Sequence, residues 1–205
     1  MYSTEPAFVL GFHGCDRSVV EKVITGKDTL RRSKNDYDWL GNGIYFWENN
    51  PARALEYAQL LKTHPQHARE PVDEPAVVGA VIDLGYCLNL LEAKSLHILK
   101  QSYELLRKTR EAVGVPMPEN LAVGAGKDLL LRKLDCAVVE TTHAYNRETG
   151  QPQYDAVRGV FVEGDKLYEN AGFNEKNHIQ ICVRNPNCIK GYFLPRQRID
   201  DFGRP

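Results

Sequence analysis

The stretch "LGNGIYFWENNPARALEYA" (residues 40–58) predicts a strand that runs directly into a helix. Residues 43–47 are apolar and aromatic, which is typical of a short buried strand. Asn50 and Pro51 then form a helix start, because an asparagine side chain caps free backbone N–H groups and proline fits the first helical position. The glycines before the strand let the backbone approach another group closely.

The aromatic residues in this stretch suit a flat ligand. A tyrosine ring offers a stacking face, and Tyr45 on the strand and Tyr57 on the helix could hold a planar ring between them. Aromatic pairs at this spacing are also common in ordinary cores. Taken alone, the stretch therefore favours a strand and helix packed in the usual way over a ligand site.

The regions around this stretch predict further strands and helices. "AFVLGFHG" (7–14) is a β-rich run, and a helix capped by Asp16 or Ser18 follows it and stops at Gly26. Residues 27–42 are polar and rich in turn formers, which indicates a long exposed loop. The apolar run 76–91 suits a sheet interior, with a bend at Gly85.

The second half of the chain changes character. Residues 92–146 have helical periodicity in two segments, 92–114 and 126–145, and strands are predicted at 154–164, 178–185 and 189–195. The order favours an α+β fold with a largely antiparallel sheet, in a single domain with a helical insertion at about 92–150. Arg158 enters an apolar strand and needs a partner, for which Asp155 is slightly favoured over a ligand phosphate.

Composition excludes several classes of protein. The 205 residues carry 26 Lys+Arg and 27 Asp+Glu, so a net charge of -1 gives no global attraction to nucleic acid or an anionic membrane. The 5 cysteines are odd in number and lack paired zinc-site spacing, which favours reduced thiols in a cytoplasmic protein and no metal site. We expect neither a signal peptide nor a membrane span.

Three motifs in order resemble the ADP-ribosyltransferase superfamily. They are "GFHG" (11–14), "GNGIYF" (41–46) with "ARALEYA" (52–58), and "NHIQICVRN" (177–185). The branch that they resemble contains diphtheria toxin and the poly(ADP-ribose) polymerases, which carry a His, a Tyr and a Glu or substitute on three core strands. The resemblance implies a split antiparallel β-sheet core with flanking helices, and it leaves 92–150 unmatched.

This resemblance implies an NAD site. His13 would bond the adenosine ribose, the Gly14 backbone would hold the nicotinamide amide, and Tyr45 and Tyr57 would stack on the nicotinamide ring. Loop 27–42 matches the family's donor loop over the dinucleotide. The residues with an implied contact to NAD in or beside this loop are Arg31 and Arg32 for pyrophosphate, Ser33 or Asp36 for a ribose or adenine edge, and Gly43. An arginine on a polar loop is also commonly just solvated.

The third motif departs from the family pattern. Cleaving nicotinamide from ribose leaves positive charge on the sugar, which the family most often offsets with a glutamate. Here Gln180 aligns with that position. Its amide oxygen can accept a ribose hydroxyl, but a neutral hydrogen bond is roughly half as strong as a charge-assisted one. The resemblance therefore implies a catalytic set of His13, Tyr45 and Gln180 that transfers a single ADP-ribose and builds no chains.

The acceptor is expected to be a macromolecule, with protein favoured over nucleic acid. Glu175 and His178 lie where relatives present residues to the target, although Glu175 can equally be a solvated loop residue and His178 can merely line the cleft. A role as a bacterial toxin with an antitoxin, or in phage defence, is one such expectation. Two other classes stay open: a module that binds NAD, ADP-ribose or a protein without catalysis, and an NAD glycohydrolase.

Overall fold

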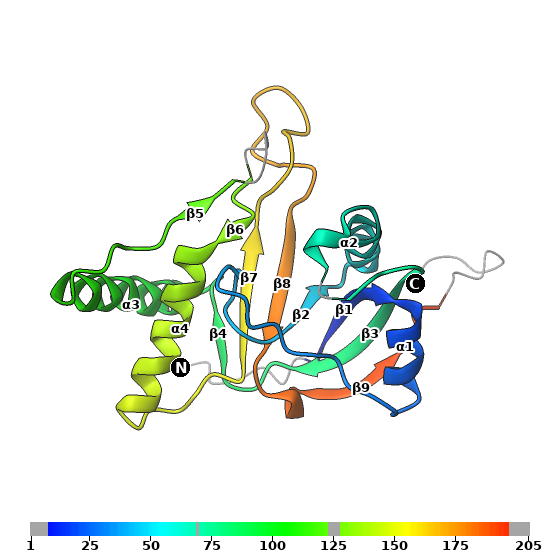
Figure 1. The fold of residues 1–205 in the computed structure, drawn as a ribbon, viewed down its shortest axis with the longest axis horizontal. Helices are drawn as coiled ribbons and strands as arrows, with labels where there is room; N and C mark the ends of the chain where they lie inside the picture. Colours follow the sequence, from blue (N-terminus) through cyan, green and yellow to red (C-terminus); the bar gives the residue numbers. More distant parts are fainter. Residues whose placement is uncertain (1–7, 69, 123–127, 197–205) are drawn as a thin grey trace.

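The strand predicted within residues 40–58 is the central strand of one large sheet, and the helix that follows it lies beside the sheet (Figure 1). The structure is a computed structural model and describes residues 8–68, 70–122 and 128–196. Its 7-stranded sheet has the order β4-β7-β8-β2-β1-β3-β9. The strands are β1 (Phe8–Asp16), β2 (Ile44–Glu48), β3 (Pro75–Asp83), β4 (Cys87–Asn89), β7 (Ala156–Phe161), β8 (His178–Val183) and β9 (Ile189–Phe193).

Neighbouring strands in this sheet are antiparallel, except for the parallel pair β4 and β7. This confirms the α+β class with a mostly antiparallel sheet. The bend at Gly85 is also confirmed: β3 and β4 are separate strands, and Gly85 between them has φ 57°, a conformation that glycine adopts at no steric cost.

The described residues form four α-helices around the sheet: α1 (Arg17–Ile24), α2 (Pro51–Thr63), α3 (Ala93–Ala112) and α4 (Lys133–Glu148). The predicted caps of the first two are present. Asp16 accepts from the Ser18 N–H at 2.9 Å, and Asn50 accepts from the Arg53 N–H at 3.1 Å. Two short 3₁₀ turns, η1 (Pro65–His67) and η2 (Pro186–Cys188), complete the connections.

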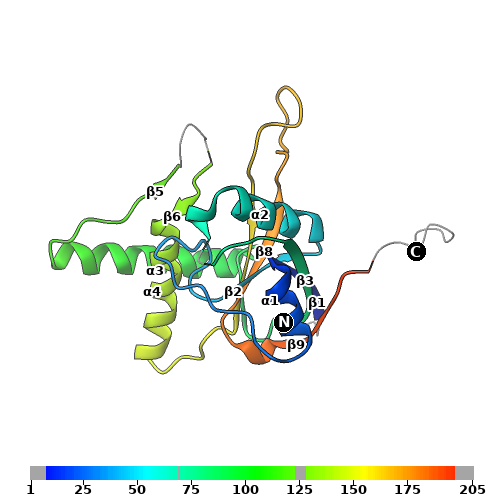
Figure 2. The same ribbon diagram turned by 45° about the vertical axis from the view of Figure 1, so that its right-hand side comes forward.

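The helical block was predicted with a longer second helix than the structure has. Residues 131–132 instead form β6 (Leu131–Arg132), which pairs with β5 (Asn120–Leu121) before α4 begins. Helices α3 and α4 pack together through a buried 2.8 Å bond from Thr142 Oγ1 to Ser102 Oγ. In Figure 2, α3 extends past α4 and away from the sheet.

Side chains of the sheet alternate between two faces that different helices cover. On the α1 face, α1 packs over Ile44, Phe46 and Ile181. The opposite face is called the α2 face: α2 packs there beside Trp47, while Val139 of α4 packs over Tyr45 and Cys182. The α2 face therefore carries the alternate residues of β2 and their cross-strand partners on β8.

The sheet is narrowly joined between β1 and β2. All nine residues of β1 pair with β3, whereas only two pair with β2, namely Gly11 with Glu48 and Phe12 with Trp47. Beyond Phe12 the ladder stops, and the His13 side chain continues the junction by donating from Nδ1 to the Tyr45 carbonyl at 2.8 Å. The sheet stays one continuous set of strands, and the place where the β1–β2 ladder ends, at His13, is called the gap.

The predicted pairing of Arg158 with Asp155 is wrong. Arg158 forms a two-pronged bond with Glu48 of β2, at 2.6 Å and 2.8 Å, and both side chains are largely buried. Asp155 instead accepts from Tyr86 N–H and from the Asn185 amide. Arg158 and Asp155 are close in sequence, but the sheet brings a better-placed carboxylate from 110 residues away.

Candidate functional site

A continuous row of aromatic rings crosses the α2 face. Tyr57 of α2 contacts Trp47 of β2 with ring centroids 5.0 Å apart, and Trp47 lies 6.5 Å from the His178 ring. His178 in turn stacks on Phe161 at 5.6 Å, and Phe161 contacts Trp39 at 4.6 Å. These five residues are called the aromatic row. They come from a loop, three strands and one helix, so only the tertiary fold brings them together.

Tyr45 and Gln180 share this face. Trp47 pairs directly with Gln180, and Tyr45 pairs with the next residue but one, Cys182. Gln180 is 9% exposed, so its side chain is nearly buried in this face. Of the predicted catalytic residues, Tyr45 and Gln180 lie diagonally across from each other on the neighbouring strands β2 and β8. Tyr57 contacts Trp47, which is the direct partner of Gln180.

The tyrosine ring of β2 is fixed by its hydroxyl. Tyr45 Oη accepts from the Leu40 N–H at 2.8 Å and donates to the Gly41 carbonyl at 2.7 Å, and burial raises its pKa. The ring described in contact with Tyr57 is Trp47. The pair of tyrosines expected to clamp a ligand is thus supplemented by a tryptophan, which sequence analysis treated as core. Its Nε1 donor is buried without a partner among the described residues.

His13 lies at the edge of this site rather than within it. Its ring is 5.9 Å from Phe46, a residue of the α1 face, and its Nδ1–H is occupied by the Tyr45 carbonyl. Burial lowers the pKa of His13, so the neutral ring is favoured with Nε2 as an acceptor. His13, Tyr45 and Gln180 thus occupy three adjacent strands, β1, β2 and β8, next to the gap in the sheet.

Two glycines assigned to the ligand are required by packing. A Cβ on Gly14 would lie 1.9 Å from the Ala54 carbonyl oxygen, because α2 crosses β1 at this point. A Cβ on Gly43 would lie 2.4 Å from Cys182 Sγ. The groups that approach these two glycines are protein atoms, and their contact with a ligand stays a prediction.

The polar loop 27–42 is held by bonds of its own. Asp38, 8% exposed, accepts from Ser33 Oγ and from the Asn35 N–H, both at 2.9 Å. Asp36 pairs with Lys133 at 2.9 Å. Ser33 and Asp36, which the resemblance assigned to the ligand, therefore have protein partners in this structure.

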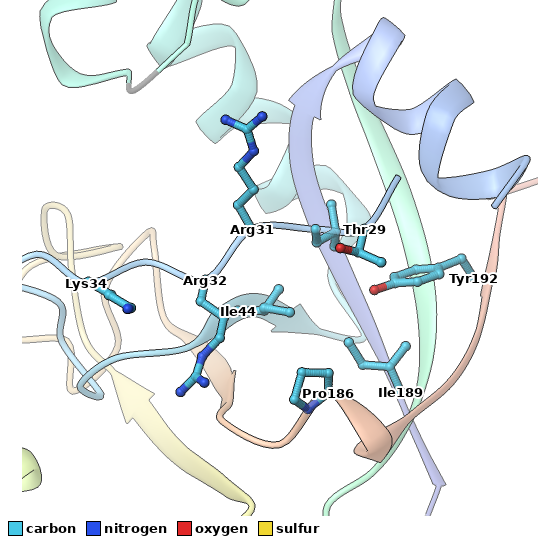
Figure 3. Close-up of a pocket in the computed structure, with 9 residues that line it drawn as sticks. Thr29, Arg31, Arg32, Lys34, Ile44, Pro186, Ile189 and Tyr192 are labelled. Atoms are coloured by element: carbon cyan, nitrogen blue, oxygen red, sulfur yellow. The ribbon is translucent and has the colours of Figure 1, made fainter. Parts of the chain in front are cut away.

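The two loop arginines point apart (Figure 3). Arg31 pairs with Glu70 of the loop that follows α2, whereas Arg32 points to a groove of about 550 Å³. Ile44, Ile189 and Tyr192 form the groove's wall on the α1 face. The two arginines are thus not brought to one phosphate, and Arg32 lies on the other side of the sheet from Gln180. The groove's full lining is Thr29, Leu30, Arg31, Arg32, Lys34, Ile44, Pro186, Ile189 and Tyr192.

His178 and Gln180 are bonded to each other. His178 Nε2 lies 3.1 Å from Gln180 Nε2, and His178 Nδ1 lies 2.6 Å from the Lys176 carbonyl. The His178 side chain is 1% exposed, which does not suit direct contact with a macromolecular acceptor. Glu163, a residue that sequence analysis missed, lies 3.7 Å from His178 Nδ1.

Glu163 gives the site a negative charge that Gln180 lacks. Its side chain is 8% exposed, and burial together with Asp128 raises the pKa of Glu163 to about 6. Arg53 and Arg132 act in the opposite direction. Glu163 lies at the end of the predicted strand 154–164 and precedes a glycine, and nothing in this local pattern distinguishes it from a solvated turn residue.

Glu175 lies in the connection between β7 and β8, residues 162–177, which projects beyond the sheet in both ribbon views (Figures 1 and 2). Glu175 is exposed, as are Leu167, Tyr168 and Phe173, at 57–61%. Such a projecting apolar tip is available to another macromolecule.

No group of three or more His, Cys, Asp or Glu within the described residues is arranged to hold a metal ion. All five cysteines are unpaired. Burial raises the pKa of Cys15 to about 12 and that of Cys136 to about 11, so these thiols are poor nucleophiles at neutral pH.

Comparison with known proteins gives one relative and no family. The chain is 26% identical over 201 residues to an uncharacterized protein of Methanocaldococcus jannaschii, covering 87% of this chain and 83% of the relative. No family model matches the chain, and no solved structure matches it. Within the described residues, no helix is both long and apolar enough to span a bilayer.

Proposed function

We propose that this protein is a mono-ADP-ribosyltransferase that cleaves NAD and transfers ADP-ribose to a macromolecule. The observation that carries the proposal is that His13, Tyr45 and Gln180 lie on the adjacent strands β1, β2 and β8, with the His13 ring bonded to the Tyr45 carbonyl and the Tyr45 and Gln180 side chains on the α2 face. Three short motifs, far apart in sequence, are thus carried by neighbouring strands, in the order that the ADP-ribosyltransferase resemblance implies.

The aromatic row offers the nicotinamide end of NAD a binding surface. Tyr57 is 40% exposed, so a planar ring can stack on it. The unpartnered Nε1–H of Trp47 can donate to a carboxamide oxygen if small side-chain shifts bring the two together. Arg31, on the side of the loop that faces α2, is the arginine placed to meet the pyrophosphate, exchanging Glu70 for a phosphate.

The proposed chemistry needs little proton transfer at the departure step. The bond between the ribose anomeric carbon and the nicotinamide nitrogen breaks, and its electron pair leaves with neutral nicotinamide. The sugar cation is then attacked by an acceptor nucleophile, which loses its proton. Gln180 accepts a ribose hydroxyl through its amide oxygen, and Glu163 contributes negative charge nearby.

We infer that the acceptor is a protein. The projecting connection between β7 and β8 exposes Leu167, Tyr168 and Phe173, and apolar and aromatic side chains favour contact with protein over nucleic acid. Glu175 lies on the same connection and can interact with the acceptor. Such an enzyme would act as a toxin in a cell that lacks a neutralising partner, as in toxin-antitoxin or phage-defence modules.

The proposal is tested by incubating the purified protein with a cell lysate and with NAD that is labelled on its adenylate phosphate. We expect label on defined proteins and stoichiometric nicotinamide release, with a loss of ~100-fold in the Gln180→Ala variant. Arg31→Ala should raise KM for NAD, whereas the matched control Arg32→Ala should leave it nearly unchanged, because the two side chains diverge.

Three other results would contradict transfer to a macromolecule. Free ADP-ribose without labelled protein would indicate an NAD glycohydrolase. Binding of NAD in calorimetry without nicotinamide release would indicate a non-catalytic module. Absence of both binding and release would remove NAD from consideration altogether.

A further inference from the structure

The proton positions of His178 and Gln180 follow from their partners. A carbonyl oxygen only accepts hydrogen bonds, so His178 Nδ1, 2.6 Å from the Lys176 carbonyl, must carry a proton. In a neutral imidazole, Nε2 is then an acceptor. The Gln180 nitrogen at 3.1 Å must therefore donate to it. This arrangement fixes which end of the Gln180 amide faces His178.

The consequence for Gln180 is a fixed orientation of its amide. Without His178, the Gln180 carboxamide can rotate by half a turn, so that its oxygen and its NH₂ group exchange positions at little cost. With His178 taking the N–H, the amide oxygen faces away from the imidazole. An oxygen at that position can accept a hydroxyl and lies favourably near positive charge, whereas an NH₂ group would repel it.

The His178 ring is itself held firmly. Its side chain is 1% exposed and stacks on Phe161, and Trp47 and Trp39 lie on either side within 6.5 Å. The charged groups that face it are Glu163 from just after β7, Arg53 from α2 and Arg132 from the segment before α4, while Lys176 supplies its carbonyl. Burial and the two arginines lower the pKa of His178, which favours the neutral imidazole.

We propose that His178 is a positioning residue that selects the orientation of the Gln180 amide, so that its oxygen is presented to the sugar of the bound dinucleotide. This inference rests on the proposed function for the identity of the ligand. It assigns His178 a role on the donor side of the reaction, in place of the acceptor-side role implied by its position in the sequence.

A doubly protonated His178 would reverse the orientation. Imidazolium donates from both nitrogens, so Gln180 would have to offer its oxygen to His178 and turn its NH₂ group toward the sugar. The enzyme should therefore lose kcat as the pH falls and His178 gains its second proton. Glu163 can shift the pH at which His178 gains this proton, because the Glu163 carboxylate lies 3.7 Å from His178 Nδ1.

A mutant cycle tests this role through its dependence on residue 180. His178→Phe keeps an aromatic ring in the row but offers no acceptor. We expect it to lower kcat at least about tenfold with little change in KM for NAD. In a Gln180→Glu background the same change should cost less than about threefold, since both carboxylate oxygens are acceptors and no orientation has to be selected. Equal losses in both backgrounds would overturn the proposal.

The pH profile gives a second readout from the same proteins. In wild type, kcat should fall on acidification as His178 is protonated. In the Gln180→Glu variant, the carboxylate of residue 180 favours protonated His178. The fall of kcat on acidification should therefore become smaller or reverse. An unchanged acid limb in Gln180→Glu would contradict the proposal.

A spectroscopic measurement separates this inference from the proposed function. Nitrogen-15 NMR of the wild-type imidazoles should show a neutral Nδ1–H tautomer for His178, assigned by its absence in His178→Phe. Its protonation at lower pH should shift the side-chain amide signals of Gln180. An Nε2–H tautomer would overturn the inference even if NAD is cleaved. The expected tautomer together with no NAD cleavage would leave the geometry in place and refute the function.

Discussion

Arg158 forms a buried ion pair with Glu48 outside the site. It and Glu48 are 17% and 10% exposed at the side chain, and their two-pronged bond joins β7 to β2 across β8. Removing one partner leaves the other as an unpaired buried charge. We expect Arg158→Met to lower the free energy of unfolding by about 3–5 kcal/mol, measured by urea denaturation followed by tryptophan fluorescence.

A double variant distinguishes this mechanism from simple loss of packing. Glu48→Gln combined with Arg158→Met should recover much of the lost stability, because no charge is then left buried. Arg17→Met is a matched control, since Arg17 pairs with Glu74 on the surface at 60% and 69% exposure and should cost less than about 1 kcal/mol. If the double variant is no more stable than Arg158→Met, the unpaired charge is not the cause.

At the scale of elements, helix α1 depends on one carboxylate. Asp16 accepts from the Ser18 N–H through one oxygen and from the Asp73 and Glu74 N–H groups through the other, each at 2.9 Å. These bonds lower the pKa of Asp16 to about 2. The residue therefore caps α1 and ties the start of β3 to it at the same time.

The pH dependence of this cap has a definite sign. The folded-state pKa lies below the ordinary value of 3.8, so the carboxylate stabilises the fold above about pH 4 and loses its contribution as the pH falls toward 2. We expect Asp16→Ala to cost about 1–2 kcal/mol at pH 7 and much less at pH 2.5, in urea titrations at both pH values. A difference that is constant with pH would show that the ionised form is not what stabilises α1.

At the scale of the whole molecule, the short ladder between β1 and β2 predicts that the strands on its two sides can unfold locally and independently. These are β1, β3 and β9 on one side and β2, β8, β7 and β4 on the other. His13 supplies the only side-chain bond described across the gap from β1. His13→Ala should speed amide exchange in residues 43–46 by about fivefold, corresponding to ~1 kcal/mol, because one buried hydrogen bond is lost. The long β1 and β3 ladder should keep its protection, as measured by hydrogen-deuterium exchange.

The control for this prediction lies in the same sheet. The ladder between β7 and β8 has six residue pairs and does not touch the junction, so its exchange should be unchanged. A uniform acceleration over all strands would mean that the sheet opens as one unit and that the junction is not a weak point.

Local signals in the sequence determined where most elements begin and end. Asp16, Asn50 and Pro51 set helix starts through capping and a fixed backbone angle, and Gly85 set the bend between two strands. These effects act over three or four residues, so a single sequence can reveal them. The start of α4 was missed because the pairing of β6 with β5 overrides helical periodicity.

Contacts between distant segments were decided only by the tertiary structure. The order of three motifs led to the prediction that His13, Tyr45 and Gln180 act together, but the sequence could not show that Trp47 contacts Tyr57 or that Glu163 lies beside His178. Nor could it show that the His178 imidazole is bonded to the Gln180 amide. The physical reason is that burial, charge pairing and proton position depend on which strands are neighbours, and strand order is fixed by the packing of the whole sheet.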